Sequence, residues 1–147
     1  MPFIDTNILV YARDKSDLKK QERAAEILGV LWRNRTGRLS TQVLQEYYVT
    51  VTRKLKPGLS RAEARQDVRD LMEWRPRPVS AGILESAWEI EDRWKLSWWD
   101  SLVAASALDC GATTLISEDM QDGLIIRSLQ ILDPFSEKFE MGQLDAL

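Results

Sequence analysis

Residues 2–10 read Pro2-Phe3-Ile4-Asp5-Thr6-Asn7-Ile8-Leu9-Val10: a short apolar run, one carboxylate, two small polar residues and a second apolar run. This pattern predicts a buried strand that runs directly into a helix. Ligands of open α/β sheets bind beyond the carboxyl ends of the strands, so Asp5 is predicted to lie where a ligand would bind. Aspartate is also a common turn or cap residue, and position alone does not separate the two roles.

The composition excludes several classes of site. Cys110 is the only cysteine and the chain has no histidine, which removes disulfides, thiolate or imidazole zinc sites and triads with a histidine base. The glycines are scattered and form neither a dinucleotide-binding turn nor a phosphate-binding loop. Carboxylates remain abundant, and they suit hard cations such as Mg²⁺ or Mn²⁺.

The length of the chain and its proportions of hydrophobic and charged residues are those of a single globular domain. Its 147 residues are 44% hydrophobic and 29% charged, which is enough apolar material for one core. The apolar run at the N-terminus is too short for a signal peptide, and no run approaches membrane-spanning length. We therefore expect a cytoplasmic protein without a membrane partner.

Apolar residues at helical spacing alternate with short apolar runs along the rest of the chain. Helices are expected over residues 6–12, around 24–32, over 41–56, 61–74 and 81–94, and over 102–110 after the opening Ser97-Trp98-Trp99-Asp100. The expected caps are Ser40 or Thr41, Ser60 in a capping box with Glu63, Ser80 and Ser97. Short strands are expected over 38–40, 113–116 and 128–132, with an edge-like segment at 76–79. The segment Asn34-Arg35-Thr36-Gly37 is expected to end the second helix. Residues 135–147 show no clear period and are expected to form a partly ordered tail. This alternation predicts a parallel sheet with helices on both faces.

Acidic residues follow two of the predicted strands. Asp5 follows the first strand and Asp119 follows the strand at 113–116, so a parallel sheet would place both at one edge. Glu118 and Asp122 lie in the same acidic loop and compete with Asp119 for any role there.

Two further acids lie on predicted helices. Asp100 is the third residue of a helix that Ser97 would cap, so it could simply complete a capping box. Ala104 and Ala107 on the same helix face suggest a packed surface, at whose rim a carboxylate needs a partner. Glu46 lies away from the centre of its apolar stripe, and periodicity alone indicates a solvated surface charge.

Four short motifs together resemble the PIN domain, and more narrowly the VapC-type toxins of bacterial toxin–antitoxin pairs. They are Phe3-Ile4-Asp5-Thr6-Asn7, Leu44-Gln45-Glu46-Tyr47-Tyr48, Trp99-Asp100-Ser101-Leu102 before a helix of small residues, and Leu115-Ile116-Ser117-Glu118-Asp119. The resemblance covers essentially the whole chain, and it is the order of the motifs that is specific.

The resemblance implies a three-layer α/β/α fold with a mainly parallel sheet and an endoribonuclease that depends on Mg²⁺ or Mn²⁺. It also implies a homodimer that a small antitoxin protein inhibits. The implied catalytic and metal-binding acids are Asp5, Glu46, Asp100 and Asp119, with Thr6, Asn7 and Ser117 as polar supports.

The net charge of −3 argues against binding nucleic acid by bulk electrostatics, so an RNA substrate would need a metal ion or a local basic patch. Arg53, Lys54, Arg61 and Arg65 are candidates for contacts with the RNA backbone, although charged helix faces are commonly just solvated.

The tryptophans divide into two groups. Trp32, Trp88 and Trp94 fall on apolar stripes and are predicted to be core residues. Trp98 and Trp99, beside Asp100, are expected to shape a pocket or an interface, with base stacking as a lesser alternative.

Two other functions fit parts of the sequence. Asp5-Thr6-Asn7 after a strand is similar to the nucleophile motif of haloacid-dehalogenase-like phosphatases, but Asn7 stands where that motif has a second acid. A PIN scaffold that binds RNA or a protein without catalysis is the other alternative.

Overall fold

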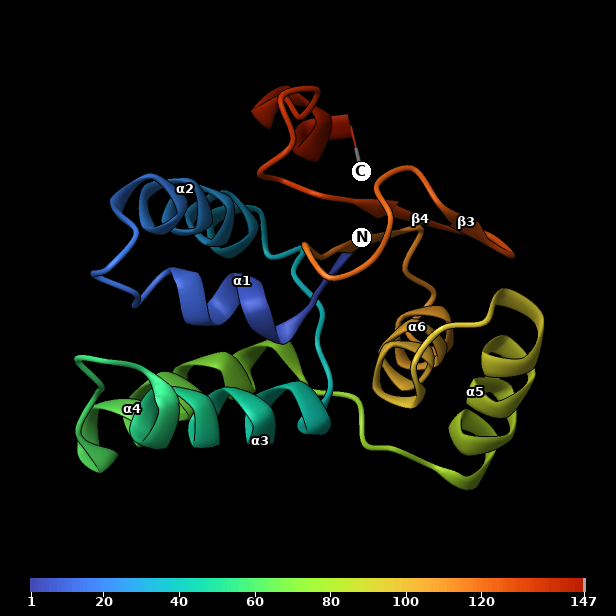
Figure 1. Cartoon of the computed structure of the whole chain (residues 1–147), viewed down its shortest axis with the longest axis horizontal. Coiled ribbons are helices and arrows are strands. Elements are labelled where there is room, and N and C mark those ends of the chain that lie inside the picture. The colour runs from blue at the N-terminus through green and yellow to red at the C-terminus, as the bar shows by residue number, and fades with distance from the viewer. Residues whose placement is uncertain (147) are drawn as a thin grey trace.

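The computed structural model of the chain describes residues 1–146, which form a four-stranded sheet surrounded by helices (Figure 1). The strands are β1 (Pro2–Ile4), β2 (Thr114–Ile116), β3 (Ile125–Ile126) and β4 (Leu129–Leu132). Their order is β1-β2-β4-β3, in which β1, β2 and β4 are parallel and β3 is antiparallel to β4. The predicted α/β class with a mainly parallel sheet is confirmed.

The apolar runs of β1 and β2 are buried along their whole length, as strands covered on both faces must be. Ile4 pairs with Ile116, and the backbone N–H of Asp5 donates to the carbonyl of Ile116 at 3.1 Å. Asp5 and Ser117 therefore leave the sheet side by side at its carboxyl edge.

Most helices begin at the predicted serine caps. Ser40, Ser60, Ser80 and Ser97 each accept a hydrogen bond from the backbone of the third helical residue, and Ser60 with Glu63 forms a complete capping box. The helices are α1 (Thr6–Tyr11), α2 (Leu18–Asn34), α3 (Thr41–Val49), the π-helix η1 (Thr50–Lys54), α4 (Arg61–Leu71), the 3₁₀ helices η2 (Met72–Trp74) and η3 (Met141–Ala146), α5 (Ala81–Trp94) and α6 (Trp98–Asp109).

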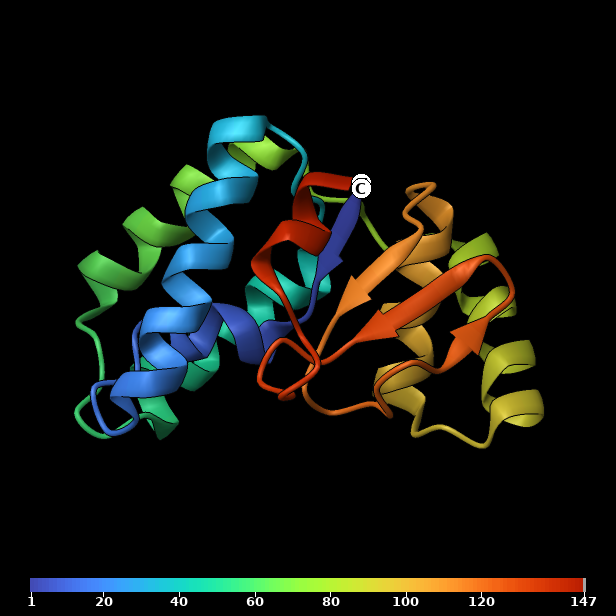
Figure 2. The same cartoon turned by 90° about the horizontal axis from the view of Figure 1, so that it is seen from above.

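Helices lie on both faces of the sheet (Figure 1). On one face α6 contacts β2 and β4, and α5 packs on the outside of α6. On the other face lies the C-terminal segment with η3, which contacts α2. The pairs α1–α2 and α3–α4 form the other end of the molecule, beyond β1 (Figure 2).

The structure differs from the expectation in the short strands. Residues 38–40 and 76–79 form only isolated bridges, Phe3 with Arg38 and Ser40 with Arg77, because each segment passes the sheet for too few residues to build a ladder. The two-residue strand β3 was not predicted. The sixth helix begins at Trp98, directly after its predicted cap Ser97.

Two tryptophans lie in other surroundings than predicted. Trp32 and Trp88 are 45% and 49% exposed, so their assignment to the core is wrong: Trp32 packs on Trp74 and Trp88 on Trp98, and the rest of each ring is open to solvent. Trp94 is half-buried, as is Trp98. The second helix ends at Asn34 with Arg35 as its C-cap, in the left-handed conformation with φ 55°, which lies within the segment expected to end it.

The residues after the sheet pack against it. Phe139 and Leu144 are buried in the core, within the segment that lacks a clear sequence period. Leu147, the last residue of that segment, lies outside the described residues. Among the described helices, none has both the length and the apolarity that crossing a membrane requires.

Candidate metal centre

Asp5 is the buried centre of the site. It is 4% exposed and caps α1, where its Oδ1 accepts a hydrogen bond from the backbone N–H of Thr6 at 2.7 Å. Its Oδ2 accepts a hydrogen bond from the Ser117 hydroxyl, also at 2.7 Å. These two bonds fix the orientation of the carboxylate, so Asp5 is both the cap residue and the candidate ligand that its position suggested.

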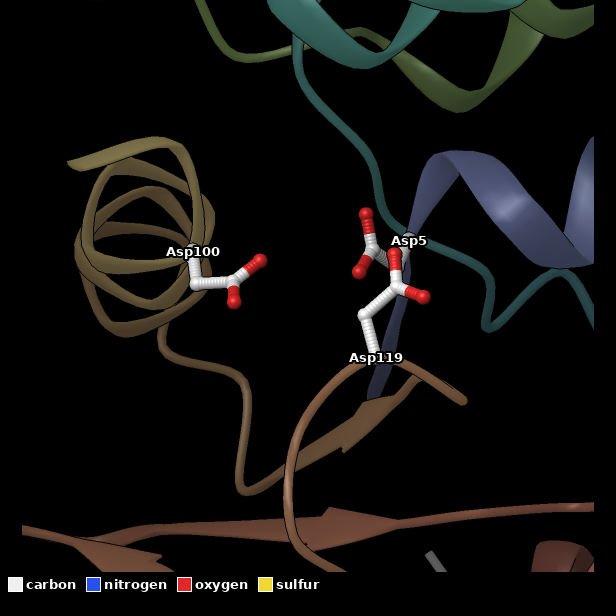
Figure 3. A group of neighbouring side chains, drawn as sticks. All are labelled: Asp5, Asp100 and Asp119. Atoms are coloured by element: carbon white, nitrogen blue, oxygen red, sulfur yellow. The ribbon is translucent and has the colours of Figure 1, made fainter. Parts of the chain in front are cut away.

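Two more aspartates approach Asp5 from separate elements. Asp100 lies in the first turn of α6, and Asp119 lies in the loop after β2, where its backbone N–H donates to the Ser117 hydroxyl at 3.1 Å. One carboxylate oxygen from each of Asp5, Asp100 and Asp119 lies within 4.8 Å of the others. Figure 3 shows the three side chains pointing into one space between α6, the end of β1 and the loop.

The surroundings of Asp5 and Asp100 disfavour the charged form of each. Burial raises the pKa of Asp5 to about 7; the hydrogen bonds from Ser117 and Thr6 oppose this shift, and the charges of Asp119 and Asp100 add to it. The pKa of Asp100 is also raised, first by burial and then by Asp119 and Glu46. A divalent cation would reverse these unfavourable interactions.

Glu46 lies beside this group but outside it. The half-buried carboxylate accepts hydrogen bonds from the Thr6 hydroxyl at 2.9 Å and from the Gln42 side-chain amide at 3.0 Å. Helical periodicity indicated a surface charge, and only the family resemblance pointed to Glu46. Gln42 was missed entirely, because a glutamine within a helix gives no signal of its own.

The structure separates Asp119 from its two acidic neighbours. Glu118 accepts hydrogen bonds from Lys20 Nζ at 2.8 Å and from the Tyr11 hydroxyl at 3.1 Å, which hold it against α1 and α2. Asp122 Oδ1 accepts from the backbone N–H of Asp133 at 2.9 Å. Of the acids in this loop, only Asp119 joins Asp5 and Asp100.

A cavity of about 1020 Å³ opens beside the acids. Thr6, Asn7, Glu46, Asp119, Lys54 and Trp99 are among the residues that line it. The Asn7 Oδ1 accepts a long hydrogen bond from the Glu118 backbone at 3.4 Å, and its buried Nδ2 has no partner among the described residues. Trp99 is 60% exposed at the mouth, as expected for a residue that shapes a pocket.

Of the predicted basic contacts, Lys54 alone lines this cavity. It lies in the π-helix η1, a helix type that occurs often at functional sites. Arg53 is exposed on the same element and Arg61 is exposed at the start of α4, while Arg65 Nε donates to the Tyr48 hydroxyl at 3.2 Å.

The donor set suits a hard divalent cation. Three carboxylates within reach of one another offer the oxygen ligands that Mg²⁺ and Mn²⁺ prefer, and no soft ligand takes part. The cluster could hold one such ion at the point where the cavity meets the sheet.

Comparison with known proteins identifies the architecture. The family model of the PIN domain matches residues 3–121. No curated protein sequence matches the chain.

Solved structures share the fold at low sequence identity. A chain of a toxin–antitoxin complex from Klebsiella pneumoniae superposes with a TM-score of 0.60 at 18% identity, over 92% of this chain and 98% of that one. A chain of VapBC2 from Rickettsia felis, solved bound to a DNA fragment from its promoter, gives 0.57 at 23% identity over 90% and 98%. VapC20 from Mycobacterium tuberculosis, described as a Sarcin-Ricin loop cleaving toxin, gives 0.59 at 20% identity over 78% and 87%.

Proposed function

This chain belongs to the PIN domain family, and from that membership we propose that it is a metal-dependent endoribonuclease, the toxin of a toxin–antitoxin pair. The observation that carries the proposal is the convergence of Asp5, Asp100 and Asp119, from three separate elements, to within 4.8 Å. Such a cluster of like charges is unfavourable without a cation, and in a chain without histidine it leaves metal-assisted hydrolysis as the available chemistry.

In this proposal Asp5, Asp100 and Asp119 hold Mg²⁺ or Mn²⁺. Glu46 lines the cavity with Asp119 and its charge acts on Asp100, so it could bind a second ion or orient a water molecule. A divalent cation bound there would activate water and stabilise the negative charge that develops on the phosphoryl group. Hydrolysis of the RNA phosphodiester would leave a 5′-phosphate.

The surrounding polar residues position the acids. Ser117 bonds both the Asp5 carboxylate and the Asp119 backbone, so it ties two of the three ligands together. Thr6 similarly links Asp5 to Glu46, through its backbone N–H and its hydroxyl. Asn7 lines the cavity with a buried amide group that has no partner in the described structure and could bind substrate.

Basic residues would counter the acidic centre. Lys54 lines the cavity and Arg53 is its neighbour in η1, so both could contact the RNA backbone, with Arg61 and Arg65 on α4 as more distant candidates. A chain with a net charge of −3 needs such local contacts.

The partners follow from the structural likeness. The similar structures include toxin–antitoxin complexes, which supports a small antitoxin protein as the partner of this chain. We also propose that the protein is a cytoplasmic homodimer.

The test is an RNA cleavage assay with purified protein in Mg²⁺ or Mn²⁺ and in EDTA. Asp100→Asn keeps the size of the side chain but removes a ligand, and should lower the cleavage rate by at least about a hundredfold, the loss typical of a damaged metal site. Asp92→Asn, an exposed acid on α5, is the matched control and should cleave at the wild-type rate. Tight RNA binding without turnover in any metal would indicate a scaffold that only binds RNA.

A further inference from the structure

A second cavity, of about 800 Å³, lies where the end of α2, the segment after it and the segment after η2 meet. Its lining includes Arg35, Arg38, Arg75 and Arg77 together with Trp32 and Trp74. Glu73 is the only acid among its lining residues. We refer to this set of four arginines and two tryptophans as the arginine pocket.

The positive charge of the arginine pocket is largely uncompensated. Arg35 and Arg75 are exposed and form no ion pair within residues 1–144. Arg77 pairs with Asp109 at 3.2 Å, but both side chains are nearly half exposed, so the pair is weak. Four cations gathered on a chain of net charge −3 make a local site for an anion.

The aromatic part of the pocket is rigid. Trp74 is 7% exposed, and its ring lies so close to Gly37 that a Cβ there would be 2.5 Å from it. Trp32 packs on Trp74 with ring centroids 5.7 Å apart and remains 45% exposed. A fixed ring that shows part of its surface to solvent beside arginines provides a surface on which a base can stack.

The arginine pocket adjoins the acidic cavity. Pro78 lines both cavities, so a single chain could cross from one to the other over this residue. The crossing point is held firmly, because the Arg77 carbonyl accepts from the Thr41 backbone at 3.0 Å and the Arg77 N–H donates to the Leu39 carbonyl at 2.9 Å.

We propose that the arginine pocket binds single-stranded RNA that flanks the cleaved bond, with phosphates on Arg35 and Arg75 and a base stacked on Trp32. The inference rests on the proposed ribonuclease function. Single-stranded RNA fits better than a duplex, since only an unpaired base is free to stack on a side chain. It also fits better than an acidic peptide, which would use the arginines but not the tryptophan.

The test is fluorescence anisotropy with a labelled single-stranded RNA of about 12 nucleotides, within the span that single-strand sites cover. Measurements in EDTA suppress metal-dependent cleavage. Arg35→Gln/Arg75→Gln should weaken binding and reduce the slope of log K against log salt by about 1.4, from about 0.7 for each lost phosphate contact on a single strand. Arg93→Gln/Lys138→Gln removes the same charge elsewhere and should leave the slope unchanged.

Trp32 provides a second, independent measurement. Trp32→Ala should weaken binding at least about fivefold, whereas Trp32→Phe should retain most of the affinity, because a phenyl ring also stacks on a base. Circular dichroism and thermal unfolding of each variant verify that it is folded.

The outcomes separate the two proposals. Variants that bind RNA with wild-type affinity and salt slope, in a protein that cleaves RNA, would show that the arginine pocket does not hold substrate. Weaker RNA binding in these variants supports the arginine pocket as an RNA-binding site, whether or not the protein cleaves RNA. Absence of turnover in Mg²⁺ or Mn²⁺ would contradict only the proposed ribonuclease activity. If polyglutamate competes as well as RNA and Trp32→Ala has no effect, the pocket binds an acidic protein segment and our proposal is wrong.

Discussion

At the scale of single residues, Asp5 links stability to the proposed metal. Burial raises its pKa from 3.8 to about 7, against the hydrogen bonds of Ser117 and Thr6 and with the help of Asp119 and Asp100. Between these pH values the unfolded chain has lost a proton that the folded chain retains. The contribution of Asp5 to the free energy of unfolding is therefore greatest below pH 4 and falls as the pH rises to about 7 in the metal-free protein.

Asp5→Asn should stabilise the metal-free protein at pH 8, because it removes a buried charge: the amide oxygen can still accept from the Thr6 N–H, and the amide N–H can donate to the Ser117 hydroxyl oxygen. The gain is a few kcal/mol at most, since one pKa unit corresponds to about 1.4 kcal/mol. It should fade as the pH falls from about 7 toward 4 and level off below 3.8, where Asp5 is protonated in both states. Thermal unfolding in EDTA across this pH range measures the effect. A variant less stable than wild type at pH 8 would show that the buried charge of Asp5 does not destabilise the metal-free fold.

Gly37 should tolerate no side chain. A Cβ at this position would lie 2.5 Å from the buried ring of Trp74, so Gly37→Ala should destabilise the fold by about 1–3 kcal/mol. Gly82→Ala is the control: a Cβ there meets only the Ser80 hydroxyl at 3.8 Å, and the helix should gain up to about 1 kcal/mol. Urea unfolding compares the two variants; equal effects would mean that the contact with Trp74 does not limit this position.

At the scale of elements, the loop after β2 gives its neighbouring acids different tasks. Ser117 and Asp119 face the metal centre, while Glu118 turns toward Lys20 and Tyr11 and fixes the loop to α1 and α2. The Lys20–Glu118 pair is about 30% exposed and so contributes little to stability, which makes positioning of the loop its main effect.

Asp119→Asn and Glu118→Gln should therefore differ. Asp119→Asn should weaken Mn²⁺ binding at least about tenfold, as loss of a ligand or its close support does, whereas Glu118→Gln should weaken it severalfold less. Isothermal titration with Mn²⁺ compares them directly. A larger loss in Glu118→Gln would make Glu118 the ligand instead.

The elements themselves were predictable because caps and buried runs are local signals. The serine caps gave the starts of α3, α4, α5 and α6, and the apolar runs gave β1 and β2. What covers a helix face is not local, which is why Trp32 and Trp88 were wrongly assigned to the core. Helical periodicity could not predict the role of Glu46 for the same reason, because Thr6 and the cavity reach it only in the folded chain.

At the scale of the whole molecule, the fold brings acids from residues 5, 46, 100 and 119 to one edge of a parallel sheet. It places Lys54 in the cavity at this edge and four arginines in the pocket that meets this cavity at Pro78. In the proposed function, a protein of net charge −3 would attract RNA through these local cations while its acidic centre held a metal ion. Sequence order predicted Asp5 and Asp119 at this edge, but the arginine pocket joins segments around residues 35 and 75 that nothing in the sequence pairs.

The proposed ribonuclease activity requires a divalent cation bound by the acids at this edge of the sheet. The most direct measurement is single-turnover RNA cleavage as Mn²⁺ is titrated, beside calorimetric binding of Mn²⁺ to the same protein. The expected result is a rate that is zero in EDTA, rises with the affinity found by calorimetry, and is lost together with Mn²⁺ binding in Asp100→Asn. Cleavage that persists in EDTA, or an Asp100→Asn variant that cleaves at the wild-type rate, would contradict it.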